Sequence, residues 1–181
     1  MKAFISMLRG INVGGQKKIR MSDLASLYES LGLAHVKTYV QSGNVVFQST
    51  KSDAAALTNL LEARIKQSWG YSVSVFIRDT NDFQRVIANN PFLNKRREDP
   101  ARLGVTFLYS LPSEEKWSGL GTPKDKADEF SVDGQEIYLF CPNGFARTKF
   151  SNTFFEKKLS VAATSRNWNT VIALHRIASQ G

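Results

Sequence analysis

A glycine-rich stretch near the start of the chain holds the residues best suited to binding chemistry. The stretch "LRGINVGGQKKIR", residues 8–20, contains three glycines and four cations and no acidic residue. Glycine adopts positive φ readily, so consecutive backbone N–H groups can converge on an anion while the cations add charge. The sequence therefore predicts either a phosphate cradle or a plain turn with solvated cations.

Two established nucleotide-binding motifs do not fit this stretch. Gly10 and Gly15 have the G-x-x-x-x-G spacing of a P-loop, but Gln16 and Lys17 follow where that motif needs Lys and then Ser or Thr. The glycine spacing also differs from the G-x-G-x-x-G of dinucleotide-binding folds. A looser anion-binding loop remains, because the stretch is long for a strand-to-helix connection and long ordered loops often bind ligands.

The elements that position this loop follow from the hydrophobic periodicity of residues 2–78. Apolar runs and helical spacings predict the order strand, helix, strand, strand, helix, strand, which is the βαββαβ unit of a ferredoxin-like sandwich. The segments are "KAFISMLR", a helix from Met21 to Leu31, "HVKTYVQ", "NVVFQS", a helix between the Ser52-Asp53 cap and Gly70, and "YSVSVFI".

The same order begins again after a helix at 80–89 and a charged linker. The predicted segments are "LGVTFLYSL", "PSEEKWSGL", a hairpin of "EFSV" and "EIYLF" with a type I′ turn at Asp133-Gly134, a helix with capping-box spacing at Thr153 and Glu156, and a last helix from about Asn167 to Ser179.

We therefore expect an α+β fold of duplicated ferredoxin-like (βαββαβ) antiparallel sandwiches, with the second copy followed by a C-terminal helix. The expected domains are a first ferredoxin-like half at 1–78, a connecting helix and charged linker at 79–100, and a second half with the C-terminal helix at 101–181.

The predicted topology places a second loop beside the glycine-rich stretch. Strands one and two of such a unit run in the same direction, so the turn "QSGN" opens at the end of the sheet where the glycine-rich stretch begins. Gln41, Ser42 and Asn44 then offer neutral donors and acceptors beside the cations. The alternative is ordinary turn chemistry, with Gly43 supplying the positive φ.

A third segment, "TSRNWNT", combines a helix start with a cation. Ser165 or Asn167 can cap the last helix, which leaves Arg166 near the positive end of the helix dipole, where a cation is disfavoured by roughly 0.3–1 kcal/mol. A bound anion would remove this conflict. The alternatives are an ion pair between Arg166 and an acid of the other half, or a guanidinium in solvent.

These three segments supply all the candidate ligand-binding residues, and we predict that Arg9, Lys17 and Arg166 serve one anion. The sequence assigns no catalytic residue, and we expect neither a cofactor nor a metal, since one cysteine and two histidines give no zinc-ligand spacing. The candidates are Arg9, Asn12, Gly14, Gly15, Lys17, Lys18, Gln41, Ser42, Asn44, Arg166 and Asn167.

The charge and cysteine content indicate the partners and the compartment. The 24 Lys and Arg exceed the 16 Asp and Glu, and the net charge of +8 favours a nucleic acid or a phosphorylated small molecule as partner. The single Cys141 excludes an internal disulfide, and no apolar run has the length of a signal-peptide core or a membrane span. We expect a cytoplasmic protein without membrane association, and the sequence does not predict its oligomeric state.

Five motifs carry a resemblance to a known family. "LRGINVGG", "TYVQSGNVVF", "NPF", "YLFCPNG" and "TSRNWNTV" resemble, in this order and over nearly the whole chain, the motifs of a mainly bacterial family known as domain of unknown function number sixteen-ninety-seven. The resemblance implies two ferredoxin-like halves. It implies no reaction, because the family has no established biochemical activity.

Three classes of function remain open at this point. The first is binding of a polyanion or phosphate-bearing ligand through the glycine-rich stretch, without catalysis. The second is an enzyme that acts on a small phosphorylated or acidic metabolite in the same cleft. The third is a protein-interaction module, in which the acidic middle of one copy meets the basic end of another.

Overall fold

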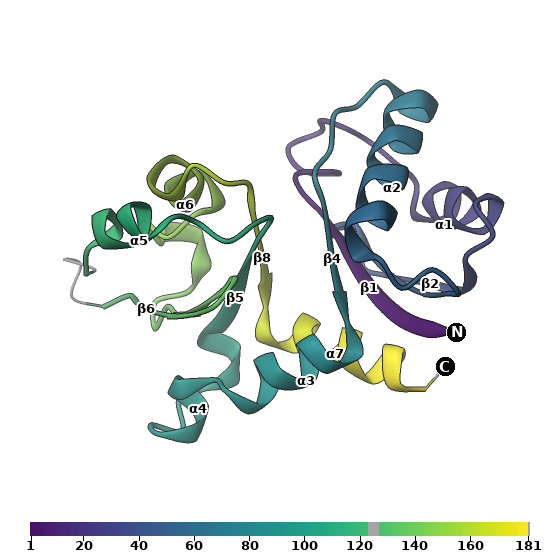
Figure 1. Ribbon diagram of the computed structural model, residues 1–181. Helices are drawn as coiled ribbons and strands as arrows, with labels where there is room; N and C mark the ends of the chain where they lie inside the picture. Colours follow the sequence, from purple (N-terminus) through teal and green to yellow (C-terminus); the bar gives the residue numbers. More distant parts are fainter. Residues whose placement is uncertain (123–126, 181) are drawn as a thin grey trace. The chain divides into compact units, whose positions relative to one another are not determined.

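The structure is a computed structural model that describes residues 1–122 and 127–180 of the chain (Figure 1). These residues form two compact units, each with a four-stranded antiparallel sheet and helices. The first unit comprises Met1–Gln84 together with Ala173–Gly181, and the second comprises Arg85–Ile172. The fold is therefore of the mixed α+β class, as expected.

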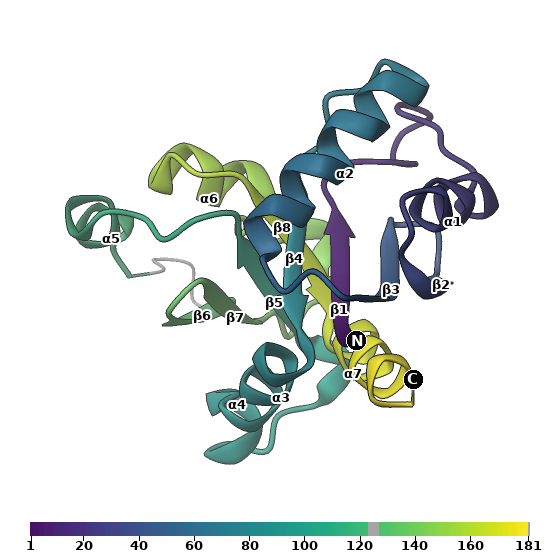
Figure 2. The same ribbon diagram turned by 45° about the vertical axis from the view of Figure 1, so that its right-hand side comes forward.

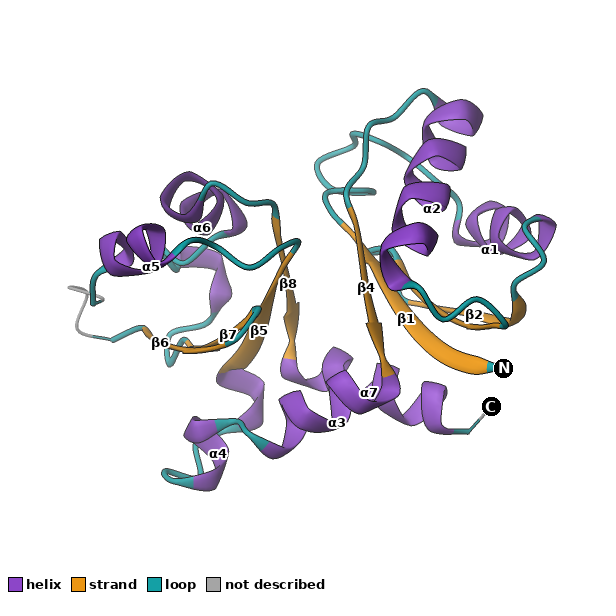
Figure 3. Ribbon diagram, viewed as in Figure 1, coloured by secondary structure: helices purple, strands orange, loops and turns teal. Residues whose placement is uncertain are grey.

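The first unit has the element order βαββαβ, with helices and strands distinguished by colour in Figure 3. Its strands lie side by side in the order β2-β3-β1-β4 (Figure 2). Each neighbouring pair of strands is antiparallel. The elements are β1 Lys2–Leu8, α1 Met21–Ser30, β2 Ala34–Tyr39, β3 Asn44–Ser49, α2 Ala54–Trp69 and β4 Val75–Asp79.

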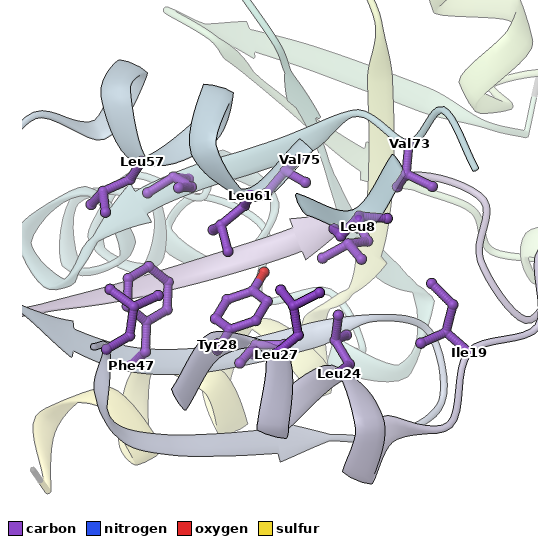
Figure 4. Packing of buried hydrophobic residues seen from close by; sticks show 14 of the residues in the cluster. Leu8, Ile19, Leu24, Leu27, Tyr28, Phe47, Leu57, Leu61, Val73 and Val75 are labelled. Atoms are coloured by element: carbon purple, nitrogen blue, oxygen red, sulfur yellow. The ribbon is translucent and has the colours of Figure 1, made fainter. Parts of the chain in front are cut away.

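The core of the first unit lies between α1, α2 and one face of the sheet (Figure 4). β1 contributes Phe4 and Leu8 to this core, two residues that share a face because side chains alternate along a strand. The Tyr28 hydroxyl is buried and hydrogen-bonds the Ser6 hydroxyl at 2.8 Å. The helices contribute Leu24, Leu27, Leu57, Leu61 and Ile65.

The second unit repeats the order βαββαβ, with strands in the order β6-β7-β5-β8 and each neighbouring pair antiparallel. Its core joins Leu108, Ile137 and Leu139 of the sheet to Phe155 and Leu159 of α6. The elements are β5 Leu103–Leu108, α5 Glu114–Leu120, β6 Glu129–Asp133, β7 Glu136–Phe140, α6 Asn152–Leu159 and β8 Ala163–Asn167.

A helix follows the last strand of each sheet directly. These are α3 Thr80–Ala88 after β4 and α7 Trp168–Ser179 after β8, which is the expected C-terminal helix. The short helix α4 Pro91–Asn94 and the 3₁₀ turn Pro100–Arg102 occupy the segment predicted as a charged linker. No helix of the described residues is long and apolar enough to cross a membrane.

The domain bounds 1–78, 79–100 and 101–181 stay predictions. The two compact units divide both helices. The end of α7, from Ala173, belongs to the first unit, and the end of α3, from Arg85, belongs to the second. In the second unit, the Tyr138 hydroxyl donates to the Val86 carbonyl of α3 at 2.8 Å.

Two local predictions for the second unit are wrong. The β6–β7 hairpin exists, but Asp133 pairs with Glu136, so Gly134 and Gln135 form the turn. Gly134 alone of these two has a positive φ, 60°, which is the pattern of a type II′ turn rather than I′. The N-cap of α6 is Ser151, whose hydroxyl accepts from the Phe154 N–H, and not Thr153.

Two strands also differ from the prediction. β4 begins at Val75, so Tyr71–Ser74 of the predicted strand lie outside it. No segment was assigned to the last strand of the second copy, which is β8, because "ATSRN" lacks the apolar alternation that predicts a strand. β8 completes the second sheet at its edge beside β5.

Asp79 links the first sheet to α3, and we predict that its charge makes stability depend on acid pH. Asp79 Oδ2 lies 2.6 Å from Lys2 Nζ, and Asp79 Oδ1 accepts from the Asp82 N–H. Burial alone would raise the pKa of Asp79, but the Lys2 ammonium and the backbone N–H groups of Asn81 and Asp82 hold it below its ordinary value of 3.8. Because the folded-state pKa is lowered, this stability is present above the unfolded pKa and is lost as pH falls through the folded one.

Asp79→Asn tests this expectation, since an asparagine keeps the Oδ1 acceptor and loses the charge. Urea unfolding of the wild type and the variant is compared at about pH 6 and about pH 3. The stability difference between the two proteins should shrink at the lower pH. A difference that is equal at both values would show that the Asp79 charge plays no part.

Candidate anion-binding site

The glycine-rich stretch connects β1 to α1 and ends in a tight turn. The Gln16 N–H donates to the Val13 carbonyl at 3.1 Å, and the turn residues Gly14 and Gly15 have φ of 59° and 75°. Positive φ at both central positions is the pattern of a type I′ turn. The predicted positive φ of the two glycines is therefore confirmed, and the turn accounts for it without a ligand.

Asn12 clamps the base of this turn. Its Nδ2 donates to the carbonyls of Ile19 and Gln41, both at 2.9 Å, and its Oδ1 accepts from the Ile19 N–H at 2.8 Å. The Asn12 N–H also donates to the Lys17 carbonyl. The side chain predicted to bind a ligand is thus occupied within the protein, and it joins the glycine-rich stretch to the turn after β2.

A second set of contacts ties the loop to residues 72–74, which lead into β4. The Arg9 N–H donates to the Ser74 carbonyl at 3.0 Å, and Lys17 Nζ donates to the Ser72 carbonyl at 2.8 Å. The loop and this segment lie at the same end of the first unit (Figure 2). Lys18 is exposed and Arg9 is half-buried. The four cations of the glycine-rich stretch therefore lie on one ordered loop.

The turn after β2 packs against the loop, as its topology predicted. Gly43 has a φ of 82°, and its carbonyl accepts from the Leu8 N–H at 2.9 Å. A Cβ at Gly43 would lie 2.8 Å from Ile11 Cδ1 and 2.9 Å from Leu8 Cβ, so only glycine fits. The side chain of Gln41 is exposed, while its carbonyl accepts from Asn12.

Asn44 stabilises this turn from inside. It is fully buried, and its Nδ2 donates to the Tyr39 carbonyl at 3.0 Å and to the Ser42 hydroxyl at 2.9 Å. The turn chemistry named as the alternative for Ser42 and Asn44 is therefore what these two side chains perform. Of the three predicted residues in this turn, Gln41 has the most exposed side chain.

The third segment corrects the prediction made for Arg166. Asn167 caps α7, since its Oδ1 accepts from the Thr170 N–H at 2.8 Å. Arg166, however, belongs to β8 and is only 8% exposed. Its Nη1 donates to the Thr164 hydroxyl and to the Ser165 carbonyl, both at 2.8 Å, so the guanidinium is held along the strand. The conflict with the helix dipole that motivated an anion there does not arise.

Left-handed backbone is concentrated at the end of the first unit. Five of the eight residues from Gly10 to Lys17 have positive φ, and two of these, Asn12 and Lys17, are not glycine. Val40, in the turn after β2, has a φ of 51°, which is unusual for a β-branched residue. Strained backbone tends to cluster at ligand clamps, because it persists only where the surroundings hold it.

Residues 1–122 and 127–180 contain no group of three His, Cys, Asp or Glu side chains placed to hold a metal ion. Cys141 is buried, and burial raises the pKa of its thiol, which donates to the Thr148 hydroxyl at 3.5 Å. The arrangement supports binding chemistry through backbone N–H groups and cations.

The sequence interpretation missed Ser72 and Ser74 because it placed them inside a strand. They line a polar cleft with the exposed face of α2, including Asn59, Glu62 and Lys66. The helical periodicity marks these three positions only as solvent-facing, so no signal in the sequence points to a cleft.

Comparison with known families identifies the chain. The family described as "Protein of unknown function (DUF1697)" matches residues 1–138. The chain belongs to this family. The expected resemblance is thereby confirmed, and membership in DUF1697 names no activity. No curated protein matches the chain.

A solved structure similar to this DUF1697 chain shows the same fold. It is the structure of the conserved bacterial protein SP0830 from Streptococcus pneumoniae, with a TM-score of 0.75 and 23% sequence identity. The similarity covers 98% of each chain, so both units are included. At this identity the comparison describes the fold only.

Proposed function

We propose that the protein binds a phosphate-bearing anion, without catalysis, at the end of the first unit where the glycine-rich loop meets the turn after β2. The observation that carries the proposal is the concentration of left-handed backbone in a loop that Asn12 clamps and that bears four cations. Ordering a long loop costs conformational entropy. A loop that only connects two elements does not require its residues to be held in left-handed conformations. Backbone N–H groups at such positions, with cations beside them, form an anion-binding concavity.

The test uses a paired variant and a matched control. Lys17→Ala/Lys18→Ala removes two charges from the loop, and Lys157→Ala/Lys158→Ala removes two from the end of α6 in the second unit. Fluorescence anisotropy with short RNA and single-stranded DNA, and calorimetry with nucleotide phosphates, measure affinity. The loop variant should lose about tenfold or more, since charge-assisted contacts contribute about 1.5–3 kcal/mol, and the control should stay within about twofold.

Two results would contradict the proposal. Equal losses in both paired variants would mean that the net charge attracts anions without a site. Absence of binding by every phosphate compound would favour the interaction module instead. The salt dependence separates the ligand classes, because polynucleotide affinity falls steeply with ionic strength and a single small-ligand site is less affected. An Arg166→Ala arm decides whether that arginine contributes, and wild-type affinity would remove it from the site.

We also infer that the two units are copies of one ferredoxin-like βαββαβ element. The strand orders of the two sheets are equivalent, β2-β3-β1-β4 and β6-β7-β5-β8. Residues in equivalent positions also match, since Arg78 of β4 pairs with Ile5 of β1 and Arg166 of β8 pairs with Val105 of β5. In both units the buried arginine donates through Nη1 to the carbonyl of the preceding residue. An Asp or Asn follows each arginine and accepts from the N–H three residues on, at the start of the next helix.

The cytoplasm is the compartment we propose. The support is the sequence, whose single cysteine cannot form an internal disulfide and suits a reducing environment. A phosphate-bearing ligand is also readily available there.

A further inference from the structure

A polar cleft opens between α2 and the segment that leads into β4. Its volume is about 360 Å³, within the range of small-molecule sites. The lining residues are Asn59, Glu62, Ala63 and Lys66 of α2, with Ser72, Val73 and Ser74 opposite. The cleft lies wholly within the first unit and has the size of a phosphorylated sugar or a mononucleotide.

The cleft shares a wall with the glycine-rich loop. Lys17 Nζ holds the Ser72 carbonyl and the Arg9 N–H holds the Ser74 carbonyl, and both serines line the cleft. A ligand whose phosphate is bound by the cations of the loop therefore has a neighbouring cleft for the rest of the molecule.

The lining is suited to hydroxyl groups rather than to a second phosphate. Glu62 Oε1 accepts from the Val75 N–H at 2.9 Å, which fixes the carboxyl group in the wall. A carboxylate offers about four acceptor positions and can accept from more than one donor at a time, and its negative charge disfavours a second anion. Asn59, Ser72 and Ser74 both donate and accept, and Lys66 supplies one cation.

We propose that this cleft binds the hydroxyl-bearing part of a phosphorylated sugar, with Glu62 accepting from vicinal hydroxyls. The inference rests on the proposed function, since the loop is to hold the phosphate. It adds the ligand class: a small phosphorylated polyol is preferred over inorganic phosphate and over a sugar that lacks one of the hydroxyls. A carboxylate that accepts from ribose hydroxyls is an established way to select such ligands.

The test is calorimetry with ribose 5-phosphate, 2-deoxyribose 5-phosphate and inorganic phosphate. The wild type should prefer ribose 5-phosphate over its deoxy analogue by about tenfold, the value of one charge-assisted hydrogen bond. Glu62→Gln keeps an acceptor for the Val75 N–H and loses the charge, so it should remove this preference and leave the affinity for inorganic phosphate unchanged or higher. Glu29→Gln, at an exposed position of α1, is the matched control and should keep the wild-type preference.

The outcomes separate the two proposals. If all three compounds bind equally well and Glu62→Gln changes nothing, the cleft is not a sugar site and the loop remains an anion site. If no compound binds, both proposals are wrong. Lys66→Ala should weaken the two sugar phosphates by several-fold, and its circular dichroism spectrum should match the wild type because the side chain is exposed. Unchanged sugar phosphate affinity in Lys66→Ala would also overturn the inference.

Discussion

Gly43→Ala is expected to lower the free energy of unfolding by about 2–6 kcal/mol, because two costs add at one position. The φ of 82° is unfavourable for any residue with a Cβ, which costs about 1–3 kcal/mol. The new Cβ would also lie under 3.0 Å from Ile11 and Leu8, and overpacking of this kind costs about 1–3 kcal/mol. Urea unfolding followed by circular dichroism gives the value.

Gly70→Ala is the matched control for this prediction. Gly70 has a φ of 74°, but a Cβ there would meet no atom within 4 Å. The control therefore carries the backbone cost alone and should lose about 1–3 kcal/mol. Equal losses in the two variants would show that the turn after β2 is not packed tightly against the loop.

Asn12→Asp is expected to be the most disruptive change in the loop, with a loss of about 2–4 kcal/mol. The aspartate keeps one oxygen for the Ile19 N–H. Its other oxygen would face the carbonyls of Ile19 and Gln41, which now accept from Nδ2 at 2.9 Å. Two hydrogen bonds are thus replaced by repulsion between acceptors, and chemical denaturation measures the result.

Two further variants separate the causes of that loss. Asn12→Gly keeps the positive φ and removes the side-chain bonds, so it should lose less than Asn12→Asp. Asn169→Asp makes the same chemical change at an exposed position of α7 and should leave stability within about 0.5 kcal/mol. The clamp is contradicted if Asn12→Asp is as stable as Asn169→Asp.

Most elements of the fold could be predicted because their sequences are locally consistent. The Asp53 cap and the Gly70 end of α2 are where the sequence placed them, with Asp53 Oδ1 accepting from two backbone N–H groups. β8 escaped prediction because Thr164 and Arg166 are buried polar residues, and a strand of this composition lacks the apolar alternation that marks a strand. Its pairing with β5 supplies the stability that local pattern does not reveal.

The site was predictable in its location but not in its construction. Topology alone placed the turn after β2 beside the glycine-rich loop, and the Asn12–Gln41 hydrogen bond confirms that the two are neighbours. The function of Asn12 as a clamp was not predictable, since its partners lie 7 and 29 positions away in the chain. Arg166 was misjudged for a different reason: because β8 was not predicted, Arg166 was placed at the start of a helix instead of in a strand.

The sequence offered two alternatives for the glycine-rich loop, a phosphate cradle or a plain turn, and the structure contains the turn. It contains a true turn at Gly14 and Gly15, and that turn belongs to a clamped loop with further left-handed residues and four cations. A simple turn requires only the two glycines. The proposed anion site would account for the clamp, the further left-handed residues and the cations.

The most direct measurement is an NMR titration of the ¹⁵N-labelled protein with inorganic pyrophosphate. Gly134 provides an internal control, because it also lies in a tight turn with a φ of 60° but belongs to the second unit. The account predicts saturable shifts of the Gly14 and Gly15 amide signals, with Gly134 unmoved. Absence of any shift at Gly14 and Gly15, or equal shifts at all three glycines, would contradict an anion site in the glycine-rich loop.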